Sequence, residues 1–100
     1  AVEAETGKTK TELEKEKRRE KLNRQALRQL KTRAQEAEKA VGSKEAEIAK
    51  LEAQMADPAL YSDAQKAADV QRVYQKAQQE LQTLYEQWEA AEAALSQEDD

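Results

Sequence analysis

Hydrophobic residues recur along both halves of the chain at alternating steps of three and four residues. A seam that repeats every 3.5 residues makes a helix supercoil against a partner helix. The first seam comprises Leu27, Leu30, Ala34, Ala37, Val41, Lys44, Ile48, Leu51 and Met55, with Lys44 as its one charged member. The second comprises Ala67, Val70, Tyr74, Ala77, Leu81, Leu84, Trp88, Ala91 and Leu95. The two seams predict two coiled-coil helices.

The dipeptide Asp57-Pro58 lies between the two seams. It predicts a turn, because the residue before a proline is pushed out of the α region. The nearest partner for each helix is then the other helix. We therefore expect an all-α fold, a two-helix antiparallel coiled-coil hairpin with a basic N-terminal helical extension.

The boundaries of the predicted segments follow from turn and capping signals. Thr11-x-x-Glu14 and Ser62-x-x-Gln65 fit capping boxes for the two helices. The predicted segments are a flexible linker at 1–10, a hairpin at 11–96 (helix 11–56, turn 57–62, helix 63–96) and an acidic tail at 97–100 that frays. Gly42-Ser43 lies off the seam, so we expect a continuous helix there and leave open whether it kinks. The chain has no initiator Met, and we expect a piece of a longer protein.

The register of the two helices is predicted from the position of the turn and from packing. A fold-back point near residues 59 and 60 pairs large residues with small ones in most layers, as interdigitation requires. Lys44 would then lie against the ring of Tyr74, and Glu98 would face Glu20 near Arg24. A slip by one heptad would set Ala34 against Ala91 and leave a gap, so we rank it lower. The favoured layers are Val41–Ala77, Ala37–Leu81, Ala34–Leu84, Leu30–Trp88 and Leu27–Ala91.

Composition excludes several classes of function. The chain has no Cys and no His, which removes thiolate or imidazole zinc sites, Cys–His or Ser–His catalysis and disulfides. Carboxylates such as Glu86, Glu89 and Glu92 fall on an exposed face with nothing to raise a pKa, so acid–base catalysis is not expected. No apolar run approaches the ~20 residues that span a bilayer. We therefore expect a cytoplasmic protein that is not an enzyme and binds no membrane, metal or cofactor.

Charge divides the chain. Residues 8–33 hold eleven Lys and Arg against four Glu, whereas residues 40–100 hold five against thirteen Asp and Glu. Such asymmetry indicates a polyanionic partner for the basic segment. A single helical face of this segment carries a line of cations, here called the cationic stripe. The stripe comprises Lys17, Lys21, Arg24, Arg28 and Lys31.

The cationic stripe lies about a quarter-turn from the seam, so the second helix would not cover it. It suits a phosphate backbone, where neutralised phosphates release counterions and binding depends strongly on salt. Two other interpretations stay open: a solvated helix held by pairs such as Glu14–Arg18 and Glu20–Arg24, and an acidic tail folded across the stripe. The eight candidate nucleic-acid-binding residues are Lys17, Arg18, Arg19, Lys21, Arg24, Arg28, Lys31 and Arg33.

Three stretches resemble a known family. They are Lys17-Arg18-Arg19-Glu20, the run LEAQMADPALYSD at residues 51–63, and Tyr85-Glu86-Gln87-Trp88-Glu89. Together they are similar to the C-terminal domain of ABC-F proteins of the Uup type, over residues 15–95. The turn motif and the placed Trp are the specific features of the resemblance, whereas the rest is generic coiled coil.

The resemblance implies a coiled-coil extension of a soluble ATPase that has two ATP-binding cassettes. Members of that family act on ribosomes, and the Uup-type extension binds DNA in some of them. ATP and Mg would belong to the cassettes, whose motifs this chain lacks. We expect a monomeric domain that binds duplex DNA or ribosomal RNA through phosphates, with the ribosome as a further partner. The alternatives are a protein-interaction module, through the tip at Leu60-Tyr61 or the acidic second helix, and self-association into a four-helix bundle.

Overall fold

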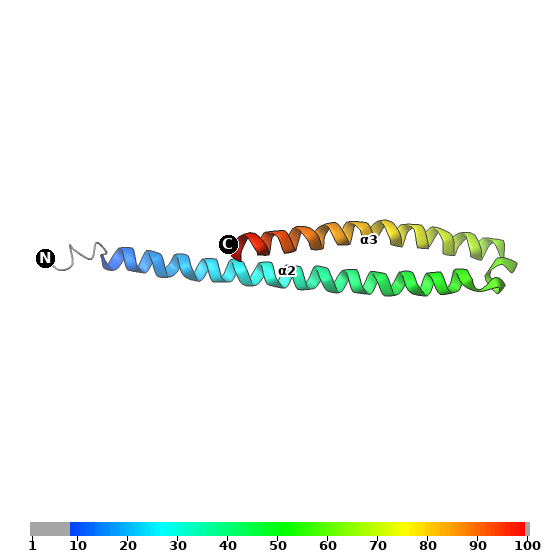
Figure 1. Cartoon of the computed structure of the whole chain (residues 1–100), viewed down its shortest axis with the longest axis horizontal. Helices are drawn as coiled ribbons and strands as arrows, with labels where there is room; N and C mark the ends of the chain where they lie inside the picture. The colour runs from blue at the N-terminus through cyan, green and yellow to red at the C-terminus, as the bar shows by residue number, and fades with distance from the viewer. Residues whose placement is uncertain (1–8, 100) are drawn as a thin grey trace.

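A single long helix forms the first half of the molecule. The structure is a computed structural model that describes residues 9–99. Helix α2 spans Lys10–Ala56, the short 3-10 helix η1 spans Pro58–Ser62, and helix α3 spans Ala64–Asp99. Helices α2 and α3 lie side by side and run in opposite directions (Figure 1). The described residues thus form the predicted all-α antiparallel hairpin, with Cα extents of 90 × 18 × 14 Å.

Helix α2 begins one residue earlier than predicted, with a different cap. The Thr9 hydroxyl accepts a hydrogen bond from the Glu12 amide at 3.2 Å, and the Thr9 amide donates to a Glu12 carboxylate oxygen at 3.3 Å. This reciprocal capping box satisfies two amides that have no partner within the helix. The predicted box at Thr11 and Glu14 is therefore wrong, because a residue spacing that suits capping occurs twice in succession. Most of the predicted linker, residues 1–8, lies outside the described residues.

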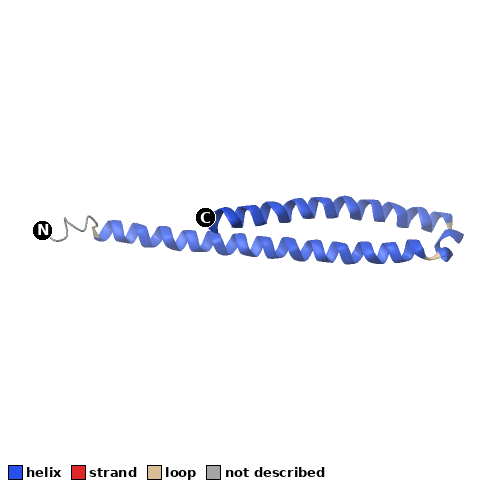
Figure 2. Ribbon diagram, viewed as in Figure 1, coloured by secondary structure: helices blue, strands red, loops and turns tan. Residues whose placement is uncertain are grey.

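Helix η1, which begins at Pro58, connects α2 to α3 (Figure 2), and side chains also hold this turn. The Asp57 carboxylate accepts from the Ala59 amide at 3.0 Å, and the Tyr61 hydroxyl donates to the Met55 carbonyl at 2.6 Å. Asp63 caps α3, because its carboxylate accepts from the Lys66 amide at 3.1 Å. The predicted capping box at Ser62 is thus wrong.

Both ends of α3 differ from the predicted helix at 63–96. The Ser62 hydroxyl donates back to the Ala59 carbonyl at 2.7 Å instead of capping the helix. Helix α3 therefore begins at Ala64, and it continues past Ser96 to Asp99.

The predicted seam positions face the partner helix. Every member of both seams is buried or half-buried, and the most sheltered are Ala34, Val41, Ala77 and Ala91. Helix α2 stays continuous through Gly42, where an added methyl group would meet nothing within 4 Å. The heptad pattern therefore identified the buried face of each helix correctly.

The register is the one that the sequence analysis ranked lower. Lys44 contacts Glu80 at 2.7 Å, and Ile48 and Leu51 pack in one cluster with Ala77 and Tyr74. Extending this antiparallel pairing along the helices sets Ala34 level with Ala91, one heptad away from the predicted Ala34–Leu84 layer. The predicted Lys44–Tyr74 and Glu98–Glu20 positions are wrong for the same reason.

The turn explains why the prediction of the register failed. Leu60 is buried at 8% exposure, and η1 lies at the outer tip of the hairpin, beyond the end of α2 (Figure 1). The chain therefore travels further outward before it reverses, which moves the start of α3 away from the assumed fold-back point. An open groove of about 500 Å³ lies beside the Ala34–Ala91 layer and is lined mainly by alanines, among them Ala37, Ala40, Ala90 and Ala94. Ala34 and Ala91 themselves are buried.

Candidate nucleic-acid interface

The N-terminal portion of α2 extends beyond the end of α3 and has no helix beside it (Figure 1). We call residues 10–26 of α2 the overhang. All residues of the overhang are exposed except Glu16, which is half-buried, and shelter by α3 begins at Leu27. Even the apolar side chains Leu13 and Leu22 are 44% and 60% exposed. The overhang is therefore a single helix that presents every face to solvent.

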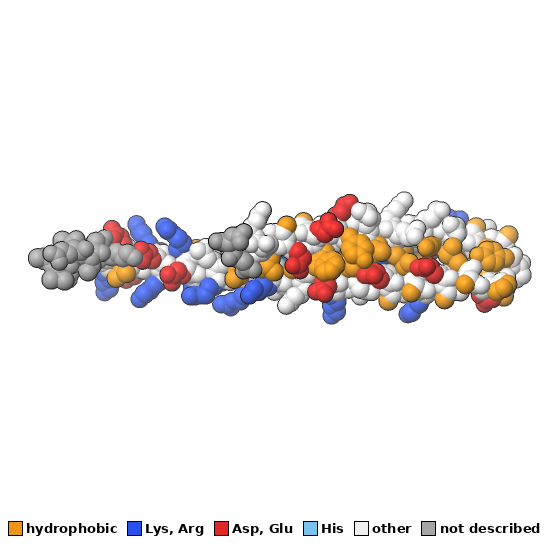
Figure 3. Space-filling model, in the orientation of Figure 1, with side chains coloured by type: hydrophobic (Ala, Val, Ile, Leu, Met, Phe, Trp, Pro, Cys, Tyr) orange, Lys and Arg blue, Asp and Glu red, His pale blue; other side chains and the backbone are white. Residues whose placement is uncertain are grey.

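The structure places all eight candidate cations on the molecular surface. Lys17, Arg18, Arg19, Lys21 and Arg24 lie on the overhang, and the other three follow on the paired portion of α2. Lys and Arg side chains gather over this end of the molecule in Figure 3, whereas acidic side chains and the apolar seam dominate the other end. The charge asymmetry of the sequence is thus a spatial asymmetry as well.

The cationic stripe is long enough to follow several phosphates. From Lys17 to Lys31 it extends about 21 Å along the axis at 1.5 Å per residue. Neighbouring members three and four residues apart have Cβ atoms about 5–6 Å apart. Arg18, Arg19 and Arg33 lie on other faces of the same helix. A phosphate backbone could therefore be contacted along the stripe and from its sides.

The candidate cations have no carboxylate partner within the described chain. Over residues 9–99, ion pairs join Lys44 to Glu47 and Glu80, and Arg72 to Asp69, and none includes a candidate cation. The pairs Glu14–Arg18 and Glu20–Arg24 are not formed there. These cations are accessible to an external anion.

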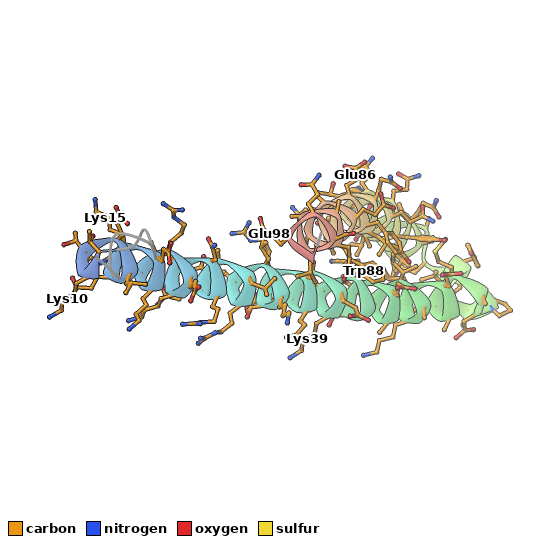
Figure 4. The ribbon with its side chains drawn as sticks, turned by 60° about the vertical axis from the view of Figure 1, so that its left-hand side comes forward. Lys10, Lys15, Lys39, Glu86, Trp88 and Glu98 are labelled. Atoms are coloured by element: carbon orange, nitrogen blue, oxygen red, sulfur yellow. The ribbon has the colours of Figure 1, made fainter. Side chains whose placement is uncertain are left out.

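The acidic end of α3 does not fold across the stripe in the described residues. Glu98 lies at the end of α3, beside α2, and takes part in no ion pair over residues 9–99 (Figure 4). In the observed register it is level with Leu27. The cations that precede Arg24 on the overhang lie beyond the reach of α3 as it is placed here.

Two further lysines of the overhang escaped the sequence analysis. Lys10 and Lys15 are exposed and point away from α2 on different sides in Figure 4. Lys10 lies one heptad before Lys17 on the face of the stripe but is separated from it by Glu14, whereas Lys15 lies on another face of the helix. The sequence feature that could have identified them is their position in the basic segment, because every face of the overhang is exposed.

The described residues hold one strongly hydrogen-bonded charge cluster away from the overhang. The Lys44 ammonium donates to carboxylate oxygens of Glu47 and Glu80, both at 2.7 Å. The hydrogen bonds that Lys44 donates to Glu47 and Glu80 raise the pKa of Lys44, and the hydrogen bond and charge of Lys44 lower the pKa of Glu80. The charges of Lys44 and Glu80 thus stabilise each other across the two helices.

The aromatic residues belong to the hairpin and not to a stacking platform. Trp88 lies in the seam and donates from Nε1 to Glu92 at 3.2 Å, and its ring centroid is 6.3 Å from that of Tyr85. Partial burial, together with the Glu45 carboxylate, raises the pKa of Tyr85. At the hairpin tip, Leu60 is buried, so of the Leu60-Tyr61 pair only Tyr61 is available to a partner, at 61% exposure.

A comparison with protein families identifies the family of this chain. The family model described as the ABC transporter C-terminal domain matches residues 3–93. The chain belongs to this family. No curated protein and no solved structure matches it.

The matched residues include all of α2 and η1 and most of α3. No group of His, Cys, Asp or Glu among residues 9–99 could hold a metal ion. None of the helices described is both long enough and apolar enough to cross a membrane. For this ABC transporter C-terminal domain, the surface that stands out chemically is the cationic overhang.

Proposed function

We propose that this chain is the non-catalytic, nucleic-acid-binding C-terminal domain of an ABC-F ATPase of the Uup type. The family match supports the coarser assignment, and the turn run at residues 51–63 with the Trp88 segment supports the finer one. ATP hydrolysis would belong to the cassettes. In this proposal the domain works inside the cell, in the cytoplasm, as a monomer.

One observation carries the binding proposal. Eight Lys and Arg side chains are exposed along one end of the hairpin, and none is neutralised by a carboxylate within residues 9–99. Holding so many like charges together costs free energy through self-repulsion, and a polyanion removes that cost. Nucleic-acid phosphates offer regularly spaced anions and release counterions when they are contacted.

The contacts would go to phosphates and not to base edges. Phosphate contacts fix position but carry no sequence information. The overhang supplies mainly long cations and few of the amide side chains that read adenine in the major groove. Binding is therefore proposed to be insensitive to sequence, with duplex DNA and structured ribosomal RNA as the two candidate ligands.

The test is a charge-reversal titration. The variant Lys17→Glu/Lys21→Glu/Arg24→Glu/Arg28→Glu is compared with wild type for labelled duplex DNA and structured RNA at several salt concentrations. We expect affinity to fall at least ~100-fold, and the slope of log K against log salt to lose about one unit per phosphate contact removed. Circular dichroism checks that the hairpin remains helical.

A matched control separates the stripe from net charge. Lys39→Glu/Lys50→Glu/Lys66→Glu/Arg72→Glu makes the same change in net charge at four exposed cations outside the candidate set. This variant should keep most of the wild-type affinity. Equal losses in the two variants, or tight binding that survives high salt and reversal of the stripe, would refute the proposed interface.

A further inference from the structure

Lys44 occupies a seam position where every other member of its seam is apolar. Its side chain is only 19% exposed, and it contacts Glu47 on its own helix and Glu80 on α3, both at 2.7 Å. Glu80 is the residue next to the seam member Leu81 on α3. A polar residue at a single core position of a coiled coil can specify register, at a cost in stability.

Apolar packing alone does not select the observed register. A seven-residue slip leaves both seams facing each other, because their pattern repeats every heptad. The observed register pairs two of the smallest and most buried residues, Ala34 and Ala91, at 3% and 5% exposure. The open alanine-lined groove lies beside them. In the slipped register Ala34 would face Leu84, which fills that layer better.

The Lys44–Glu80 contact exists in one of the two registers only. After a slip, Lys44 would be level with Tyr74 and would lose Glu80. Glu80 would be level with Ala37, and on its side of the seam it would have Ala40 in place of Glu47, with Arg33 one turn further along. The slip therefore removes the Lys44–Glu80 attraction, while both seams still face each other.

The register also decides how much of α2 is bare. In the observed register α3 ends level with the start of the sheltered portion of α2, near Leu27, and the overhang is open. A slip by one heptad moves the end of α3 about 10 Å along α2 at 1.5 Å per residue. Glu98 would then be level with Glu20, and the last turns of α3 would lie beside the helix turns that carry Lys21 and Arg24. The Glu98 carboxylate would then compete with a ligand for these cations, although the stripe itself does not face α3.

We propose that the contact of Lys44 with Glu80 is a register latch that keeps the cationic overhang uncovered, and that release of the latch lets α3 slide and mask it. The functional half of this inference rests on the proposed nucleic-acid binding. The structural half, that the Lys44–Glu80 contact sets the register, does not rest on it, because it concerns the hairpin alone. Any event that removes the charge of Lys44 or Glu80 would act as the switch.

The structural half is tested by distance measurement between spin labels on the full chain. The chain has no native Cys, so Gln35→Cys/Gln97→Cys, both exposed positions, takes two labels at defined sites. The latch is removed with Lys44→Met, and Lys50→Met is the matched control, with the same loss of charge at an exposed site of the same helix. Wild type and Lys50→Met should give one distance. Lys44→Met should add a second population whose labels are further apart by up to about 10 Å.

Thermal unfolding gives an independent signature. A buried apolar residue in place of a seam Lys should keep or raise the melting temperature even as the register becomes mixed. Lys44→Met that shows a single, unshifted distance would overturn the latch, because the turn alone would then set the register. Glu80→Gln, which keeps the side-chain shape, should also release the latch, and a single unshifted distance in this variant would overturn it as well.

The functional half is tested with the same proteins and a labelled DNA duplex. When only the open register binds, the apparent Kd rises as the inverse of the open fraction. A variant that is half slipped by spin labels should thus bind about twofold more weakly than Lys50→Met. A slipped population with unchanged affinity would overturn the masking. Failure of wild type itself to bind would refute the proposed function, while the distance measurement would still decide the latch.

Discussion

The overhang and the paired portion of α2 share one helix but are stabilised in different ways. The paired portion buries Ala34, Val41, Ile48 and Leu51 against α3. The overhang buries no residue fully and exposes Leu22 at 60%. Isolated helices are marginal in water, so the overhang relies on its cap, its helix-forming residues and its continuity with the paired portion. The paired portion of the hairpin therefore stabilises the helical conformation of a segment that α3 does not cover.

The overhang and the paired portion of α2 also differ in whether their charges are compensated. Cations on the overhang point to solvent without a carboxylate partner in residues 9–99, whereas Lys44 in the paired portion contacts two carboxylates. A charge near the seam must be compensated, because burial disfavours an unpaired ion. A charge on the overhang carries no such requirement, and it stays available for a ligand.

The largest expected contrast comes from truncating one apolar side chain in each portion. Ile48→Ala should lower the free energy of unfolding by about 2–4 kcal/mol, because it leaves a cavity in the cluster with Leu51 and Ala77. Leu22→Ala should change it by less than about 0.5 kcal/mol, as is usual for surface positions. Chemical denaturation followed by circular dichroism measures both. A large loss for Leu22→Ala would show that the overhang is packed in solution, against a second copy or another surface.

The next contrast concerns the cap. Thr9→Ala removes the hydroxyl that accepts from the Glu12 amide, and loss of an N-cap typically costs about 1 kcal/mol. The overhang should fray while the paired portion keeps its stability. Amide hydrogen exchange should therefore quicken over the first turns of α2 and stay unchanged beyond Leu27. Thr11→Ala is the control, and equal fraying in this variant would favour the capping box that the sequence predicted.

The seams could be predicted from sequence because period alone decides which face is buried. All members from Leu27 to Met55 and from Ala67 to Leu95 are sheltered as expected. The register could not be predicted in the same way. A heptad repeat is unchanged by a seven-residue slip, so the choice falls to the geometry of the turn and to Lys44, whose partner Glu80 lies outside the strict seam pattern.

In the candidate site, too, features set by local sequence could be predicted, and features that depend on long-range packing could not. Exposure of Lys17, Lys21 and Arg24 followed from their angular distance to the seam. The length of the overhang did not, since it depends on where α3 ends and hence on the register. The pair Glu20–Arg24, which belonged to one of the interpretations left open, does not form within residues 9–99, because an exposed pair on a helix gains only about 0.2–0.5 kcal/mol. Such a small gain does not fix long side chains in one conformation.

The smallest contrast lies within the paired portion itself, on its outer face. Gly42 is next to the buried Val41 in sequence, yet a methyl group built on it meets nothing within 4 Å. Gly42→Ala should raise the free energy of unfolding by about 0.5–1 kcal/mol, because alanine loses less backbone entropy in a helix. Thermal melts of Gly42→Ala and Ser43→Ala measure the gain in stability, which should be larger for Gly42→Ala than for Ser43→Ala. A loss of stability would mean that this face meets a neighbour or that α2 bends at Gly42 in solution. A gain would show that outward-facing positions of the paired portion respond to substitution as positions of the overhang do. Contact with α3, and not position along α2, would then decide how much a residue contributes to stability.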